Sequence, residues 1–195
     1  MSELTDRQLV DAFRNGDSDS FGVLLKRYQN KVFSYILMHV KNRQQAEDLF
    51  QDAFVKIIQT IKSGTYREEG KFLQFAIRIA HNIVMDSFRY GSRLPVTDGP
   101  DKDKSIVDDI RIEDENVEDK MIRNQVYVDV AKLVDMLPDD QREVVHMRMY
   151  DDFSFKEIAD ITNVSINTAL GRMRYALINL RKMIHEYGLD FSLDI

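Results

Sequence analysis

The chain contains no cysteine, no tryptophan and only three prolines among its 195 residues. Without cysteine it has no disulfide bond, no thiolate metal site and no cysteine nucleophile, which fits a reducing compartment. No apolar run approaches the ~20 residues that a membrane-spanning helix requires. The opening residues carry charge every few positions, unlike a signal peptide. We therefore expect a soluble, cytoplasmic protein.

The usual marks of an enzyme or a metal protein are also missing. The four histidines have no metal-ligand spacing, no glycine-rich phosphate loop occurs, and no nucleophile–base pair is visible. The acidic stretch after residue 97 lacks the D-x-D-x-D-G spacing of a calcium loop. We expect no catalysis, no metal, no cofactor and no small-molecule substrate.

Strand-like alternation and internal repeats are absent, and apolar residues recur instead at spacings of three and four. This periodicity is typical of amphipathic helices and is strongest over residues 46–61 and 72–88. The predicted fold class is all-α. We expect two helical domains, residues 1–92 and 120–187, joined by a flexible acidic linker over 93–119 and followed by a tail, 188–195.

The net charge of −6 is unevenly distributed. Residues 98–119 contain ten acidic and three basic residues, a net of −7, whereas residues 62–93 contain six basic and three acidic residues, a net of +3. Residues 165–185 contain no Asp or Glu. In an acidic protein, attraction to phosphate is the simplest reason for two basic islands. A charged helical face that is merely solvated is the alternative.

The second basic island lies within a predicted helix-turn-helix, residues 154–182. Ser154 and Glu157 form a capping-box pattern, Asn163 tolerates a left-handed backbone, and Ser165 can cap a second helix. This plan is typical of DNA-reading helix-turn-helix motifs, although a plain helical hairpin has the same outline. The spacing predicts an inward face of Ile166, Ala169, Met173, Ala176, Leu177 and Leu180. It predicts an opposite face of Asn167, Thr168, Arg172, Arg174 and Tyr175.

Two stretches resemble one known family. AEDLFQDAF (46–54) and FLQFAIRIAHN (72–82) resemble region 2 of bacterial RNA polymerase sigma factors, and LPDDQREVV (137–145) with the helix-turn-helix resembles region 4. With only these two regions and a short linker, the chain resembles the extracytoplasmic-function (ECF) group. The resemblance implies a transcription initiation factor that binds core RNA polymerase and directs it to promoters.

The resemblance also assigns roles to residues. The polar face of the helix 46–61 is implied to dock on the clamp coiled coil of the polymerase through Asp48, Gln51 and Asp52. The loop 62–71 and the next helix are implied to read the minus-ten element, in duplex and melted single-stranded DNA. Their candidate residues are Lys62, Tyr66, Arg67, Lys71, Arg78, Asn82, Arg89 and Tyr90. The candidate residues for the minus-thirty-five element are Ser165, Asn167, Thr168, Arg172, Arg174 and Tyr175.

The sequence departs from the family pattern at three positions. Phe75 stands where many relatives have Trp, and Leu170 and Gly171 stand where relatives often have a basic residue and then Ser. Gly171 costs a helix roughly 1 kcal/mol relative to Ala, but it can let the backbone approach DNA closely. The sequence that this helix reads is therefore not predicted.

Two partner questions remain open at this stage. A stand-alone helix-turn-helix regulator would explain residues 139–182 but would leave the pattern over 46–90 without a purpose. The resemblance further implies an anti-sigma factor, commonly membrane-linked, that holds the protein at the membrane. No residue of the sequence identifies that partner.

Overall fold

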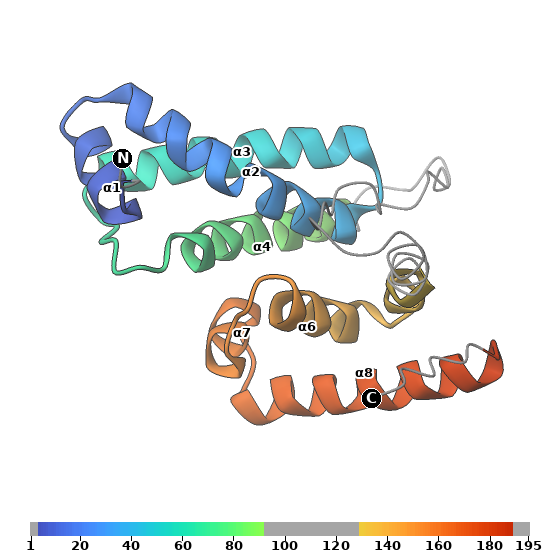
Figure 1. Ribbon diagram of the computed structural model, residues 1–195. Helices are drawn as coiled ribbons and strands as arrows, with labels where there is room; N and C mark the ends of the chain where they lie inside the picture. Colours follow the sequence, from blue (N-terminus) through green and yellow to red (C-terminus); the bar gives the residue numbers. More distant parts are fainter. Residues whose placement is uncertain (1–3, 92–128, 189–195) are drawn as a thin grey trace, which may run out of the picture. The chain divides into compact units, whose positions relative to one another are not determined.

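A computed structural model describes residues 4–91 and 129–188 of the chain (Figure 1). Every regular element in these ranges is a helix, which confirms the predicted fold class. The chain divides into two compact units, Met1–Asp103 and Lys104–Ile195. The predicted linker, 93–119, lies outside the described residues. Among the described helices, none combines the length and apolar character that crossing a bilayer would need.

Over residues 4–91, the first unit contains four helices, which are drawn in blue to green in Figure 1. They are α1 (Asp6–Arg14), α2 (Ser18–Val40), α3 (Arg43–Lys62) and α4 (Phe72–Gly91). Helices α2, α3 and α4 pack against one another, and α1 packs on α2. The largest fully buried side chains of this core include Tyr35, Ile57 and Phe72. The apolar periodicity of residues 46–61 and 72–84 therefore marks the inner sides of α3 and α4, whereas Phe88, near the end of α4, is 42% exposed.

The ends of these helices follow local sequence signals. Thr5 and Gln8 form a reciprocal capping box at the start of α1. The Asn42 side chain accepts a hydrogen bond from the Gln45 amide at the start of α3. Gly64, with a φ of 74°, follows the end of α3. The two caps satisfy backbone groups that a helix end leaves without intrahelical partners. The left-handed backbone of Gly64 turns the chain away from the helix axis.

The second unit contains a helical stretch over residues 129–135, then α6 (Asp139–Met149), α7 (Phe155–Thr162) and α8 (Ile166–Glu186). Helices α6 and α7 pack on α8. A core cluster joins Val134, Leu137, Val145 and Ala176. The partly buried residues Val130, Met173, Leu180 and Met183 pack against this cluster. The unit is short, so single contacts between its helices matter for its stability.

Arg142 holds the turn that leads into α6. Its side chain is 3% exposed, and its Nη1 donates to the carbonyl oxygens of Asp135 at 3.1 Å and Leu137 at 3.3 Å. Its Nη2 donates to the Asp139 carboxylate. These bonds satisfy carbonyl groups at the end of the preceding helix, where Pro138 stops continuation. One buried guanidinium therefore fixes the direction of the chain between the two helices.

Substitution of Arg142 should destabilise the second unit. Arg142→Met keeps much of the buried volume but removes three donors, so we expect the free energy of unfolding to fall by about 2 kcal/mol. Chemical denaturation of the full chain, followed by circular dichroism, measures this change. The exposed Lys156→Met is the control and should change stability by less than about 0.5 kcal/mol. Equal midpoints for the two variants would contradict the role given to Arg142.

Candidate nucleic-acid interface

An exposed polar stripe runs along α3. Asp48, Gln51 and Asp52 are all exposed, and their spacings of three and four place them on one side of the helix. The apolar Val55 is also exposed on this side of α3. The opposite side is buried and includes Phe54. Carboxylates and amides on such a surface can accept charge-assisted hydrogen bonds from a basic partner.

The loop between α3 and α4 is held by contacts from α1. Arg14 Nε donates to the Ile61 carbonyl at 3.4 Å, and Arg14 Nη2 donates to the Tyr66 carbonyl at 2.5 Å. Glu68 is buried, and its carboxylate accepts hydrogen bonds from the Lys71 amide at 2.7 Å and from the Tyr66 hydroxyl. The loop thus has a defined path across the end of the helical bundle.

Sequence reasoning missed both Arg14 and Glu68. The two Arg14 contacts join residues 47 and 52 positions apart, so no local pattern announces them. Glu68 lies in a polar loop, where an acid is ordinarily expected to face solvent. Its burial follows only from the way the loop folds back on Tyr66.

The Tyr66 ring already has a stacking partner within the protein. It lies parallel to Phe75, with ring centroids 3.8 Å apart and an interplanar angle of 16°. Burial, followed by the hydrogen bond to Glu68, raises the pKa of Tyr66 well above its ordinary value. Tyr66 is therefore a neutral hydrogen-bond donor at physiological pH. A nucleic-acid base that stacks on Tyr66 would therefore extend the existing stack of Tyr66 and Phe75.

A row of exposed polar and basic side chains follows α4. Lys71, Arg78, Asn82 and Arg89 are exposed, and their separations of seven, four and seven residues place them on one side. Arg89 forms a surface ion pair with Asp86 at 3.0 Å. Such exposed pairs contribute little to stability and are readily exchanged for phosphate.

The other three minus-ten candidates lie at the two ends of this row. Lys62 and Arg67 are exposed on the loop side, and Lys62 Nζ lies 5.3 Å from the centre of the Phe13 ring. Tyr90 is exposed near the end of α4. The structure therefore brings most of the predicted basic residues to the solvent-exposed surface of one unit.

The predicted helix-turn-helix is present in the second unit. Ser154 and Glu157 form the capping box of α7, and Asn163 has a left-handed φ of 58° after it. The Ser165 side chain accepts a hydrogen bond from the Thr168 amide at 3.0 Å and caps α8. These local predictions are confirmed, and Ser165 is thereby committed to the start of α8.

The rotation of α8 about its axis differs from the prediction, as shown by Ile166, Leu177 and Arg172. Ala169 and Ala176 are buried, but Ile166 is 46% exposed and Leu177 is 42% exposed. The prediction that Ile166 and Leu177 face inward is therefore wrong. Each helical residue turns about 100°, so Leu177 points well away from the side on which Ala176 packs.

Arg172 was predicted on the outer face, and that orientation is also wrong. Its position three residues after Ala169 and four before Ala176 places it on the packed side. Its side chain is 24% exposed, and its Nε lies 3.3 Å from a carboxylate oxygen of Asp140. A contact between Arg172 and the minus-thirty-five element stays a prediction.

The outer face of α8 keeps the remaining candidates. Asn167, Thr168, Arg174 and Tyr175 are exposed. Gly171 lies among them, and a Cβ atom added there would meet nothing within 4 Å. Within residues 4–91 and 129–188, therefore, no contact requires glycine at this position. The face combines amide, hydroxyl, guanidinium and phenol groups, which suit a DNA groove.

Comparison with known families accounts for both units. The profile described as Sigma-70 region 2 matches residues 24–94, and the profile described as Sigma-70, region 4 matches residues 127–175. The chain is 29% identical over 181 residues to the ECF RNA polymerase sigma-E factor of Escherichia coli K12, covering 89% of this chain and 91% of that protein. The chain is an ECF-type RNA polymerase sigma factor.

A sigma factor directs RNA polymerase to promoters and is an initiation factor, not an enzyme. This ECF sigma factor is also 28% identical over 180 residues to the RNA polymerase sigma-H factor of Pseudomonas aeruginosa, covering 89% of this chain and 90% of the relative. The two sigma regions give a purpose to the pattern over residues 46–90. The alternative of a stand-alone regulator is therefore set aside.

Two solved structures share the fold of the ECF sigma factor. CnrH in complex with the cytosolic domain of CnrY aligns with a TM-score of 0.61 at 18% identity, covering 93% of this chain and 97% of CnrH. The sigma factor RpoE in complex with the anti-sigma factor NepR from Bartonella quintana aligns with a TM-score of 0.62 at 17% identity, covering 85% of this chain and 96% of that one.

The open surroundings of Gly171 generate a prediction. Gly171→Ala should raise the free energy of unfolding by about 0.5–1 kcal/mol, because alanine favours the helix and meets no neighbour. The control, Gly64→Ala, should lower stability, because Gly64 has a φ of 74°. Denaturation of both variants measures the contrast. A loss of stability in Gly171→Ala would show that glycine is needed inside the protein.

Proposed function

We propose that the ECF sigma factor divides its work among three surfaces on the two sigma domains, 1–92 and 120–187. The stripe on α3 binds core polymerase, the loop after α3 together with α4 opens and reads the minus-ten element, and α8 reads the minus-thirty-five element. The observation that carries this proposal is the exposure of an acidic-and-amide stripe and of a cationic row on different helices of one unit. Opposite charges suit different partners.

Polymerase binding uses Asp48, Gln51 and Asp52. These residues dock on the clamp coiled coil, where arginine side chains would donate charge-assisted hydrogen bonds to the two carboxylates. Exposure of all three side chains in the free protein supports this assignment, because no buried contact must be broken first.

Minus-ten recognition uses the loop and the row on α4. Cations along the row hold the phosphates, and the aromatic pair of Tyr66 and Phe75 provides a surface next to which an unstacked base can rest. Contacts from Arg14 and Glu68 support this role, since a loop that is already ordered loses less entropy on binding. The proposed residues are Lys62, Tyr66, Arg67, Lys71, Arg78, Asn82, Arg89 and Tyr90.

Minus-thirty-five recognition uses the first half of α8 in the major groove. Asn167, Thr168, Arg174 and Tyr175 supply the direct contacts, and Ser165 orders the helix start at the DNA. Arg172 contributes to DNA binding only after it leaves Asp140, so we give it a positioning role between α8 and α6. Gly171 leaves room for a phosphate or a base edge to approach the backbone.

Regulation by an anti-sigma factor is the second part of the proposal. Two proteins of the same fold are seen in complexes, one with an anti-sigma factor and one with the cytosolic domain of CnrY. By analogy, an anti-sigma partner holds the ECF sigma factor away from polymerase in the cytoplasm. A membrane-linked partner would place it at the membrane.

Charge reversal on α3 tests polymerase binding. Asp48→Arg with Asp52→Arg should weaken binding to core polymerase at least about tenfold, since each lost charge-assisted bond costs roughly 1.5–3 kcal/mol. The control is Glu47→Arg, another exposed acid, which lies one position away, faces about 100° around the helix and forms only a surface ion pair with Arg43 at 3.0 Å. Titration against labelled core enzyme measures both. Equal affinities for the double variant and the control would sink this assignment.

Two neighbouring arginines test the reading helix. Arg174→Ala should weaken binding of the polymerase holoenzyme to minus-thirty-five DNA and reduce the slope of log K against log salt by about 0.9. Arg172→Ala should instead lower the stability of the second domain, because it leaves Asp140 without its cation. Salt titrations by fluorescence anisotropy, with melting curves, separate the two effects. The assignment fails if Arg172→Ala changes the salt slope and Arg174→Ala does not.

A further inference from the structure

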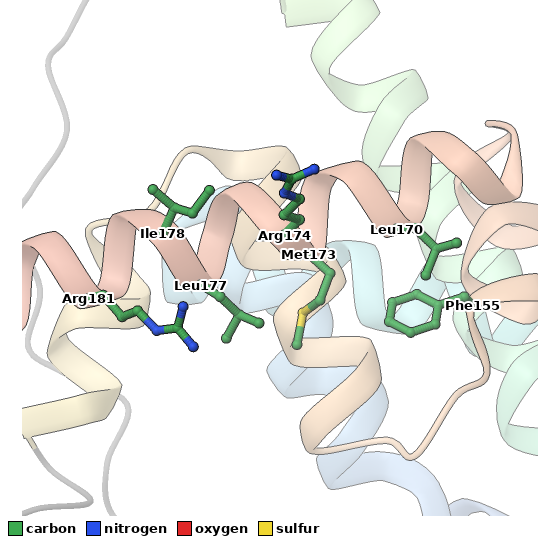
Figure 2. A pocket seen from close by; sticks show the side chains of 7 residues that line it. All are labelled: Phe155, Leu170, Met173, Arg174, Leu177, Ile178 and Arg181. Atoms are coloured by element: carbon green, nitrogen blue, oxygen red, sulfur yellow. The ribbon is translucent and has the colours of Figure 1, made fainter.

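An apolar groove lies along α8, bordered by α7, with a volume of about 440 Å³. Figure 2 shows Leu170 and Leu177 along α8, Phe155 of α7 beside Leu170, and Arg181 beyond Leu177. Arg174 and Ile178 form the other edge of the groove. We call this surface the α8 groove. None of the residues that line it is acidic.

The α8 groove leaves several large aliphatic side chains in contact with water. Leu170 is 43% exposed, Leu177 is 42% exposed and Ile178 is 46% exposed. Single exposed apolar residues are ordinary, but three on one helix next to two arginines form a contiguous patch. Covering such a patch is favourable by roughly 25 cal/mol per Å² of apolar area. Apolar side chains of an occupant would cover the exposed aliphatic residues, and its acids would pair with the arginines. The patch therefore suits an occupant that is both apolar and acidic.

We propose that residues 189–195 of the same chain dock in the α8 groove, antiparallel to α8. These residues, LDFSLDI, lie outside the described residues. Their sequence alternates Leu189, Phe191, Leu193 and Ile195 with two acids and a serine. In an extended segment this alternation places the apolar side chains on one side and the acids on the other. The segment contains no basic residue, and the groove no acidic one.

The segment starts where it can turn back along the helix. Helix α8 ends at Glu186, and Gly188 has a left-handed φ of 61°, a conformation that redirects the chain at helix ends. Seven extended residues span at most about 24 Å. Along the helix, Arg181 and Arg174 lie about 10 Å and about 21 Å before Gly188. Both arginines are therefore within reach of the segment.

The positions of charge match along this antiparallel path. Asp190 and Asp194 lie roughly 7 Å and roughly 20 Å beyond Gly188 in an extended chain. They come level with Arg181 and Arg174, respectively. Arginine stems can lie against the apolar floor while the guanidinium groups stay at the surface, where the acids are. Leu193, on the apolar side of the segment, lies roughly 17 Å beyond Gly188 and therefore comes level with Leu177.

Docking would cover Arg174, one of the residues proposed to contact the minus-thirty-five element. The segment would thus restrain DNA binding by the second domain in the free protein. This consequence rests on the proposed function, whereas the docking itself does not. The docked segment is also a competitor for any other ligand of the α8 groove.

A disulfide cross-link tests the docking directly, since the natural chain has no cysteine. The test pair is Leu177→Cys with Leu193→Cys, and the control pair is Tyr175→Cys with Leu193→Cys. Tyr175 is 62% exposed and lies two residues from Leu177, about 200° around the helix. Under mild oxidation of the full chain, we expect the test pair to form an intramolecular disulfide at least five times faster than the control. Peptide mass spectrometry and non-reducing gels measure the yield.

Further arms decide between occupants. Asp190→Lys with Asp194→Lys should lower the cross-linking rate of the test pair to that of the control. Equal rates for the two cysteine pairs would overturn the docking, and so would disulfide-linked dimers in place of monomers, which would favour a second copy. Deleting residues 189–195 should raise affinity for minus-thirty-five duplex several-fold. If the cross-link forms and this affinity does not change, the docking stands and its control of DNA binding is overturned.

Discussion

The burial of two alanines sets the rotation of α8, and with it the chemistry that the second domain exposes. Ala169 and Ala176 lie one above the other on α8 and are fully buried. Small side chains let helices approach closely, and seven residues are nearly two full turns. With these positions inward, Arg172 meets Asp140 and Arg174 faces outward. A different rotation would exchange the roles of the two arginines.

The first domain solves a different problem, which is to hold a polar loop in a defined path. Arg14 does this from α1 by donating to backbone carbonyls, and Glu68 does it from within the loop by accepting from an amide and a phenol. Burial of a carboxylate is costly unless its oxygens are hydrogen-bonded, and here both oxygens are. The loop that we assign to promoter opening is therefore tied to the packing of α1 on the rest of the bundle.

The surface charge of this ECF sigma factor is divided between an acidic and a cationic region. The net charge of the chain does not show this division. The acidic stripe of α3 and the cationic row of α4 belong to one small helical unit, although the chain as a whole carries a net charge of −6. Surface charges act mainly over about 8 Å at physiological salt, so local groups decide which partner approaches which face. An acidic protein can therefore carry one surface that suits a basic partner and another that suits phosphate.

Much of the fold was predictable from local patterns. The apolar spacing located α3, α4 and α8, the pairs Thr5–Gln8 and Ser154–Glu157 marked helix starts, and Asn163 marked a left-handed turn. These features depend on residues within four positions of one another. Tertiary structure alone decided that Leu177 lies outside, that Arg172 pairs with Asp140, and that Arg14 reaches Tyr66. Those outcomes depend on which neighbouring helix packs against each face. The periodicity of a single helix does not say how wide a strip of its surface the neighbours bury, or at what angle they cross it.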